Sequence, residues 1–377
     1  MKILHKNNLA FRELENGISK FFSLWFLFFA VSYTLGAQGV DDEKDLAVDT
    51  SSVVSIDSEE DWDLFGNQDI LRLSLQFNLK EYQKYSQEPV YQDAILTIYS
   101  GEKSVEKAVR IKPRGEFRRK YCSFPPLKLN IKKTEFDNDY LKKQTTFKFV
   151  THCEHSNVYE SNLLKEFLVY KLFNQLTDMS FRVRLVQMEY IDTGKKKKKV
   201  FKKYGFLIEH INSVAERNNA FVMKNEKLGQ SVMEKNHMAL VALFEYMIGN
   251  IDWSITGLHN MKILKINDHN LPEPIPVPYD FDYSGIIDAE YAIPSAKLRI
   301  GSVTERLYGG ICLPEETIIE AKKVFIENRD AFIKIIEDFE YLDKKGKQKM
   351  INYLESFYPI VENEKAFQRE IIDACVK

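Results

Sequence analysis

Hydrophobic and polar positions alternate along the chain between residues 70 and 150, as they do in β-strands that bury one face. In Leu71–Phe77 every second residue is apolar, because successive side chains of a strand point to opposite faces of the sheet. Further short segments follow between Gly, Pro and charged turns, at 94–99, 108–111, 127–131 and 146–150. We therefore predict a β-rich first half built on an antiparallel sheet.

One helix interrupts these predicted strands. Between Glu160 and Leu176 the apolar residues recur at helical spacing and fall on one face. Strands are predicted again at 184–191 and 204–209, and the five lysines Lys195–Lys199 lie between them. Because like charges repel and gain by extending into water, we interpret this run as the solvated tip of a hairpin. Docking of an acidic surface or acidic substrate at the lysines is the alternative.

The second half of the chain has helical periodicity. Residues 233–249 are strongly apolar and end in Gly249-Asn250, a typical helix C-cap. No internal repeat is visible, and three more helices are predicted at 315–343, 346–358 and 363–376. The change of pattern near residues 212–220 predicts a β-rich N-terminal lobe over 67–215 and an α-rich C-terminal lobe over 216–377.

The first 37 residues have the pattern of a secretory signal: basic residues, an apolar run from Phe21, and small residues at Gly36-Ala37. The apolar run Phe21–Ala37 has 17 residues, whereas a spanning helix needs about 20. We therefore predict cleavage near Ala37, with an uncleaved membrane anchor as the alternative. Residues 38–66 are acidic and rich in serine, which predicts a flexible tether. The predicted location is therefore the periplasm, the bacterial cell surface or the exterior.

Composition narrows the class of protein. The 377 residues are 44% hydrophobic and 29% charged, as in an ordinary globular protein. With 53 basic and 55 acidic side chains, the chain lacks the basic excess of a nucleic-acid-binding protein. Four cysteines are too few for a disulfide scaffold, and none has C-x-x-C spacing. After export they could stay as buried thiols or pair, and the pairing does not follow from the sequence.

The candidate chemistry lies in residues 250–285. Asn260 follows Asp252 after eight residues, and Asp280-Phe-Asp282 follows a short hydrophobic segment. Phosphoryl transfer needs a carboxylate near the acceptor hydroxyl, and an Asn with a second carboxylate to hold Mg²⁺ on the phosphates. Oxygen ligands suit such a hard cation. By itself the pattern is weak, since Asp and Asn also stabilise turns.

Several segments that surround these residues carry a resemblance through their order and spacing. They are Arg114-Gly115 with Lys128 in the next strand, Asn162–Phe173, Phe181–Val186 with Tyr204–Ile211, Ile251–Asn260, and Pro278–Asp282. From about Arg110 to Gly285 the chain resembles the spore coat protein H (CotH) type of atypical secreted kinases. The resemblance implies a two-lobed α+β fold of the protein-kinase type, with an antiparallel β-rich lobe that carries one helix, followed by a helical lobe.

The same resemblance implies the roles of residues on the metal side of the site. Asp252 would be the catalytic carboxylate near the acceptor hydroxyl. Asn260 and Asp280 would bind Mg²⁺ or Mn²⁺, and Asp282 would support them or act as a further ligand.

On the nucleotide side the resemblance implies contacts to ATP. Lys128 would contact the phosphates, Glu166 would pair with Lys128 from the helix, and Arg114 would also reach phosphate. Glu209 would end the strand that leads to the hinge beside the adenine.

Three functions are compatible with these residues. The first is an exported kinase that transfers the γ-phosphoryl of ATP to Ser or Thr of secreted or surface proteins, with membrane contact only through an uncleaved signal. The second is a non-catalytic envelope scaffold, or pseudokinase, which is favoured by Glu116 and by the lack of Ser or Thr in Arg114–Arg119. The third, a metal-dependent hydrolase, lacks an evident water-activating His or second metal cluster.

Overall fold

The computed structural model describes residues 64–66, 69–85, 87–100, 103–132, 141, 143–224, 227–298 and 300–377. The predicted signal segment and all but residues 64–66 of the predicted tether lie outside these ranges. Within them, no helix has the length and apolar character needed to cross a membrane.

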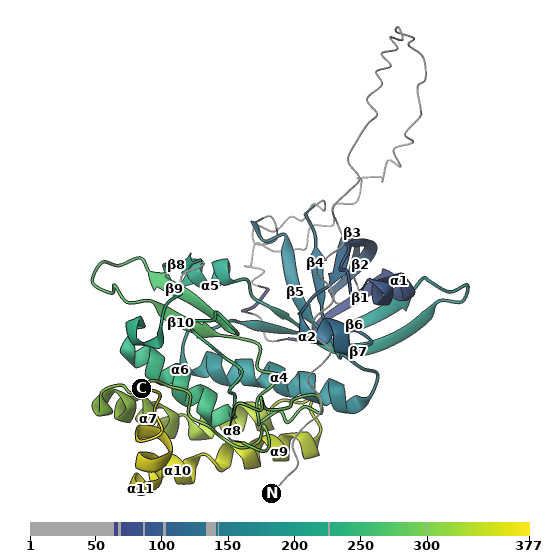
Figure 1. Ribbon diagram of the computed structural model, residues 1–377. Helices are drawn as coiled ribbons and strands as arrows, with labels where there is room; N and C mark the ends of the chain where they lie inside the picture. Colours follow the sequence, from purple (N-terminus) through teal and green to yellow (C-terminus); the bar gives the residue numbers. More distant parts are fainter. Residues whose placement is uncertain are drawn as a thin grey trace, which may run out of the picture. The chain divides into compact units, whose positions relative to one another are not determined.

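A closed barrel forms the first part of the described chain (Figure 1). The strand order is β1-β2-β3-β4-β5-β7-β6, and the barrel closes where β1 pairs with β6 in parallel. The other neighbouring strands are antiparallel. The prediction of a purely antiparallel sheet was therefore wrong for the β1–β6 pair. The strands are β1 Leu71–Phe77, β2 Gln92–Ser100, β3 Lys103–Pro113, β4 Leu127–Asn130, β5 Thr146–Val150, β6 Val183–Asp192 and β7 Lys199–Ile208.

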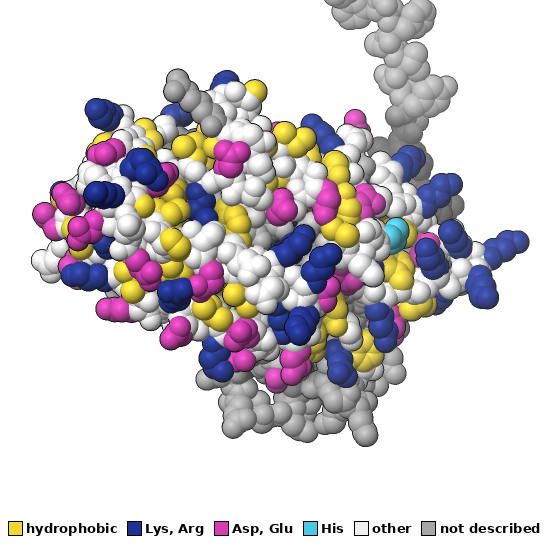
Figure 2. Space-filling view, turned by 90° about the horizontal axis from the view of Figure 1, so that it is seen from below, with side chains coloured by type: hydrophobic (Ala, Val, Ile, Leu, Met, Phe, Trp, Pro, Cys, Tyr) yellow, Lys and Arg dark blue, Asp and Glu magenta, His cyan; other side chains and the backbone are white. Residues whose placement is uncertain are grey.

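The lysine run lies at the tip of the β6–β7 hairpin, as predicted. Residues 193–200 are all exposed. Figure 2 shows basic side chains gathered at the right of the view, where this hairpin projects in Figure 1. Docking of an acidic partner there stays a prediction.

More helices accompany the barrel than the single predicted one. The long helix α4 (Asn157–Leu176) is confirmed, and its N-cap Ser156 accepts a hydrogen bond from the Val158 amide. Three short helices were not predicted, because each is too short to show helical periodicity. They are α1 (Leu79–Lys84), α2 (Phe117–Tyr121) and α5 (Ile211–Arg217).

The second part of the chain is mostly helical and contains a three-stranded sheet of β8 (Ala220–Met223), β9 (Met261–Ile266) and β10 (Ile275–Pro278). The predicted helix at 233–249 is α6, which ends at Gly249 in the left-handed conformation. The predicted helix at 315–343 divides at Asn328. The helical segments are η1 Gln230–Val232, α6 Lys235–Ile248, α7 Glu315–Glu327, α8 Arg329–Glu337, α9 Lys344–Glu355, α10 Tyr358–Glu362, α11 Glu364–Phe367 and the π-helix Gln368–Ile372.

Two hydrophobic cores stabilise this arrangement. The smaller core fills the barrel, with residues such as Leu75, Ile111 and Phe149. The larger core joins α4 and the outer side of the barrel to α6 and the C-terminal helices. Figure 1 shows α4 between the barrel and α8 and α9. Helix α4 belongs to the second core. The described residues all fall in one compact unit. The division into two lobes at residue 215 therefore stays a prediction.

Candidate functional site

The loop after α6 holds Asp252 in a fixed position. Asn260 Nδ2 donates to Asp252 Oδ2 at 3.0 Å and to the Asp252 carbonyl at 2.7 Å, and His259 Nε2 lies 2.9 Å from Asp252 Oδ1. Asn250 Oδ1 accepts the Asp252 amide. The Asp252 side chain is nevertheless 38% exposed. The loop therefore presents an oriented carboxylate that a second molecule can reach.

The segment after β10 places Asp280 beside this loop. The Tyr279 amide donates to the Asn260 carbonyl at 3.0 Å, which joins the two segments. Asp280 has a φ of 66°, in the left-handed region, and its amide donates to the Tyr170 hydroxyl on α4. A non-glycine residue in this conformation costs energy and persists where the surrounding structure fixes it. The structure thus brings together the predicted pair Asn260 and Asp280.

Arg118 on α2 bridges three carboxylates, and sequence reasoning missed it. Its Nη1 lies 3.2 Å from Glu166 Oε2, its Nη2 lies 2.8 Å from Asp280 Oδ1, and its Nε lies 3.1 Å from Asp282 Oδ2. The guanidinium side chain is 10% exposed and Glu166 is 1% exposed. Arg118 and Arg119 are adjacent in the sequence, and no spacing rule distinguishes them before α2 is known.

Burial and charge shift the pKa values of these acids in different directions. Burial raises the pKa of Glu166 to about 8 and that of Asp282 to about 6, although Arg118 opposes both shifts. Burial also acts on Asp280, but Arg118, Arg114 and Lys148 outweigh it and lower its pKa. Asp280 therefore stays ionised near neutral pH, and of the three carboxylates it makes the shortest contact with Arg118.

Lys148 on β5 is a cation without a hydrogen-bond or ion-pair partner among the described residues. Its Nζ lies 5.0 Å from the centre of the Tyr279 ring. Burial, Arg114 and Lys262 lower the pKa of Lys148 to about 8, while Asp280 acts in the opposite direction. An unpaired, partly buried lysine beside a carboxylate suits the binding of an anion.

Lys128 does not form the pair with Glu166 that the resemblance had implied. It lies on β4 directly opposite Lys148, one strand further from β7. The predicted pair between Lys128 and Glu166 is replaced by the pair between Arg118 and Glu166. The reason is the strand order, since β5, and not β4, leads directly into α4.

Glu209 also has a different environment from the predicted one. Arg217 Nε lies 3.1 Å from Glu209 Oε1, and the Arg182 amide donates to Glu209 Oε2 at 3.0 Å. The carboxylate is buried and bound within the protein, where it holds Arg217, the last residue of α5. We do not assign it a contact to adenine.

Arg114 lies near the acids of the site. Its amide donates to the Pro126 carbonyl, and Gly115 follows it with a φ of 89°. Burial lowers the pKa of Arg114, and Asp280 and Glu166 oppose this shift. The positive charge of Arg114 thus helps to lower the pKa of both Asp280 and Lys148.

Asn260 and Asp280 suit a cation that is bound together with a phosphate group, rather than a metal ion that the protein holds by itself. In the described part of the chain, no three His, Cys, Asp or Glu side chains are arranged to hold a metal ion. Asn260 uses Nδ2 and Asp280 uses Oδ1 in the contacts above, which leaves Asn260 Oδ1 and Asp280 Oδ2 as oxygen ligands. Mg²⁺ commonly binds one or two protein carboxylates together with substrate phosphates and water.

All four cysteines are paired. The disulfides are Cys122–Cys153, which adjoins α2, and Cys312–Cys375 in the C-terminal part. Of the alternatives left open by the sequence, the structure therefore contains disulfides and no free thiol.

Comparisons with known proteins give a structural likeness and no family. No protein-family model matches the chain. No curated protein matches it. Among solved structures, the chain is similar to the crystal structure of the Helicobacter pylori proinflammatory kinase CtkA, with a TM-score of 0.37 and 10% sequence identity. The similarity covers 66% of this chain and 92% of the other. At this TM-score it carries no part of the assignment, which rests on the residues described above.

Proposed function

We propose that this protein is an exported atypical kinase that transfers the γ-phosphoryl of ATP to a Ser or Thr hydroxyl of a secreted or surface protein. The observation that carries the proposal is the position of Asp280. It adjoins the oriented Asp252 and Asn260 pair through Tyr279, it is paired with Arg118, and the charges of Arg114 and Lys148 help to lower its pKa. Two disulfides support export, because such bonds persist in oxidising compartments.

Each side chain has a distinct task in this proposal. Lys148 and Arg114 bind phosphate oxygens, and Asn260 and Asp280 hold Mg²⁺ or Mn²⁺, which neutralises the charge that develops on the transferred group. Asp252 orients the acceptor hydroxyl and accepts its proton, and His259 and Asn260 hold that carboxylate in place.

A non-catalytic scaffold is the second candidate, and Arg118 is the observation that favours it. The guanidinium already pairs with Asp280 and Asp282 and so competes with a metal for their oxygens. A site of this kind could bind an anionic group and carry out no chemistry.

The test of nucleotide binding is a thermal shift of the protein with ATP and Mg²⁺ or Mn²⁺. A ligand at 100 times its dissociation constant adds about 2.7 kcal/mol of stability, so the melting temperature should rise only when nucleotide and metal are both present. Lys148→Met should remove most of this rise, because the variant lacks the unpaired cation whose charge acts on Asp280.

The matched control is Lys128→Met, which removes the same charge from the neighbouring strand. This variant should keep most of the rise. The proposal fails if ATP and GTP give no shift with either metal, and the assignment of Lys148 fails if Lys128→Met has the larger effect.

A further inference from the structure

Helix α2, which carries Arg118, has little that holds it in place through its own sequence. It has five residues, lacks a side-chain N-cap bond, and contains no buried residue. Its two aromatic side chains, Phe117 and Tyr121, are both 43% exposed. Helices this short are unstable alone, so neighbouring segments must determine the position of Arg118.

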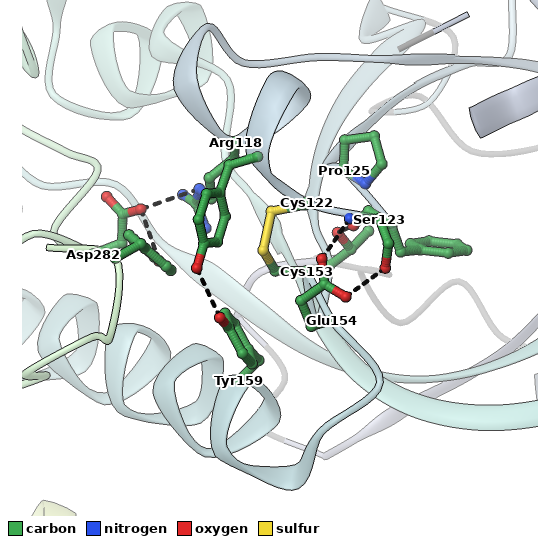
Figure 3. Close-up of a disulfide and its surroundings, with 12 residues drawn as sticks. Arg118, Cys122, Ser123, Pro125, Cys153, Glu154, Tyr159 and Asp282 are labelled. Carbon is green, nitrogen blue, oxygen red and sulfur yellow. Dashed lines mark hydrogen bonds and ion pairs between the residues drawn. A yellow bond between two sulfur atoms is a disulfide. The ribbon is translucent and has the colours of Figure 1, made fainter. Parts of the chain in front are cut away.

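Contacts at the C-terminal end of α2 provide that support (Figure 3). Cys122, the residue after the helix, forms the disulfide with Cys153. The amide and hydroxyl of Ser123 both donate to the Glu154 carboxylate, each at 2.6 Å. Tyr121 and Tyr159 share a hydrogen bond between their hydroxyl groups. Figure 3 shows Arg118 turned toward Asp282, and the disulfide lies on the other side of Arg118.

The disulfide links the two elements that carry the two ends of an ion pair. Cys122 adjoins α2, which carries Arg118, and Cys153 lies just before α4, which carries Glu166. Cys153 has a φ of 60°, and the Phe124 amide donates to its carbonyl at 2.9 Å. A left-handed cysteine is retained only where its surroundings fix it. The bridge therefore sets the distance from α2 to α4 at the candidate site.

We propose that the Cys122–Cys153 disulfide positions Arg118 against Glu166, Asp280 and Asp282, and that nucleotide binding depends on this bridge. This inference rests on the proposed function, and Arg118 acts in it as a positioning residue. When Arg118 leaves the three carboxylates, the site loses a positive charge, and Asp280, whose side chain is 35% exposed, loses its ion-pair partner. The unpaired charge of Asp280 then opposes the binding of an anionic nucleotide.

The test compares two double variants of the whole chain. Cys122→Ser with Cys153→Ser should weaken binding of ATP with Mg²⁺ by about tenfold, the size expected when a charge-assisted bond at the site is lost. Cys312→Ser with Cys375→Ser removes the other disulfide, which lies in the C-terminal part, and should leave the dissociation constant unchanged. Calorimetry below the melting temperature of each variant measures affinity separately from stability.

Arg118→Lys shows whether the bridge acts through Arg118. This variant keeps a positive charge among the acids but cannot reach all three, so it should also bind about tenfold more weakly. When the Cys122→Ser and Cys153→Ser changes are added to Arg118→Lys, the affinity for ATP with Mg²⁺ should fall little further. Losses that multiply to about a hundredfold would overturn the inference, because independent effects combine in that way.

Hydrogen exchange gives a readout that needs no nucleotide. Without the bridge, amides of Phe117–Tyr121 and of Asp280–Tyr283 should exchange faster, and Arg118→Lys should accelerate the second segment. Binding that is unchanged in the bridge variant overturns the inference and leaves the proposed function intact. A wild type that binds no nucleotide overturns the proposed function, and unchanged exchange then overturns the positioning as well.

Discussion

Asp252→Asn should lower phosphoryl transfer by about 10²–10⁴-fold, the range for removal of a general base, while binding of nucleotide and Mg²⁺ stays close to that of the wild type. The amide has the shape of the carboxylate, so its oxygen can accept from Asn260 Nδ2 and its nitrogen can donate to His259 Nε2. The loop therefore keeps its structure, but the side chain cannot accept the proton of the acceptor hydroxyl.

Transfer of labelled γ-phosphate from ATP to the protein itself, or to extracted envelope proteins, measures this effect. Asp268→Asn is the control, since it makes the same change at an exposed position after β9. This control should retain full activity. Equal activity of Asp252→Asn and the wild type would remove Asp252 from the mechanism and favour a different base.

Local patterns were sufficient to predict most of the secondary structure. Alternation identified the strands, and helical periodicity identified α4 and α6, because each signal depends on neighbours in sequence. The Asp252 to Asp282 region was also identified from the sequence, since Asp252 comes shortly after a helix and Asp280 shortly after a strand. The structure brings these residues together as adjoining loops.

The remaining parts depend on how distant segments meet. Alternation gives the face of a strand but not its neighbour, so the parallel pairing of β1 with β6 was missed. For the same reason Lys128 was selected, although it is Lys148, on the strand before α4, whose charge acts on Asp280. Arg118 was missed because its three partners come from α4 and the loop after β10, 48 to 164 residues away in sequence.

Glu245 lies in α6 below the Asp252 loop, and its burial predicts a large pH effect on stability. The side chain is 1% exposed; Oε2 accepts from Asn250 Nδ2 at 2.9 Å, and Oε1 has no partner among the described residues. Burial raises the pKa of Glu245 from 4.5 to about 8, against the effect of the Asn250 hydrogen bond. The folded protein thus keeps a proton at Glu245 that the unfolded chain has already released near neutral pH.

Glu245→Gln should therefore raise the free energy of unfolding at pH 9 by about 3–5 kcal/mol and change it little at pH 4.5, since each pH unit between two pKa values corresponds to about 1.4 kcal/mol. The sign follows from proton binding. Below pH 4.5 both states hold the proton, whereas between 4.5 and about 8 only the folded state holds it, so wild-type stability falls as the pH rises. Glutamine has no proton to release and keeps an oxygen for Asn250.

Urea unfolding at several pH values measures the difference between the two proteins, in which the titration of all other groups cancels. Glu327→Gln removes the same charge at an exposed position of α7 and should follow the wild-type curve. A constant difference between Glu245→Gln and the wild type from pH 4.5 to 9 would show that Glu245 is ionised in the folded protein. Helix α6 would then carry a buried negative charge close to the exposed Asp252, and the affinity of this part of the site for a cation would be correspondingly higher.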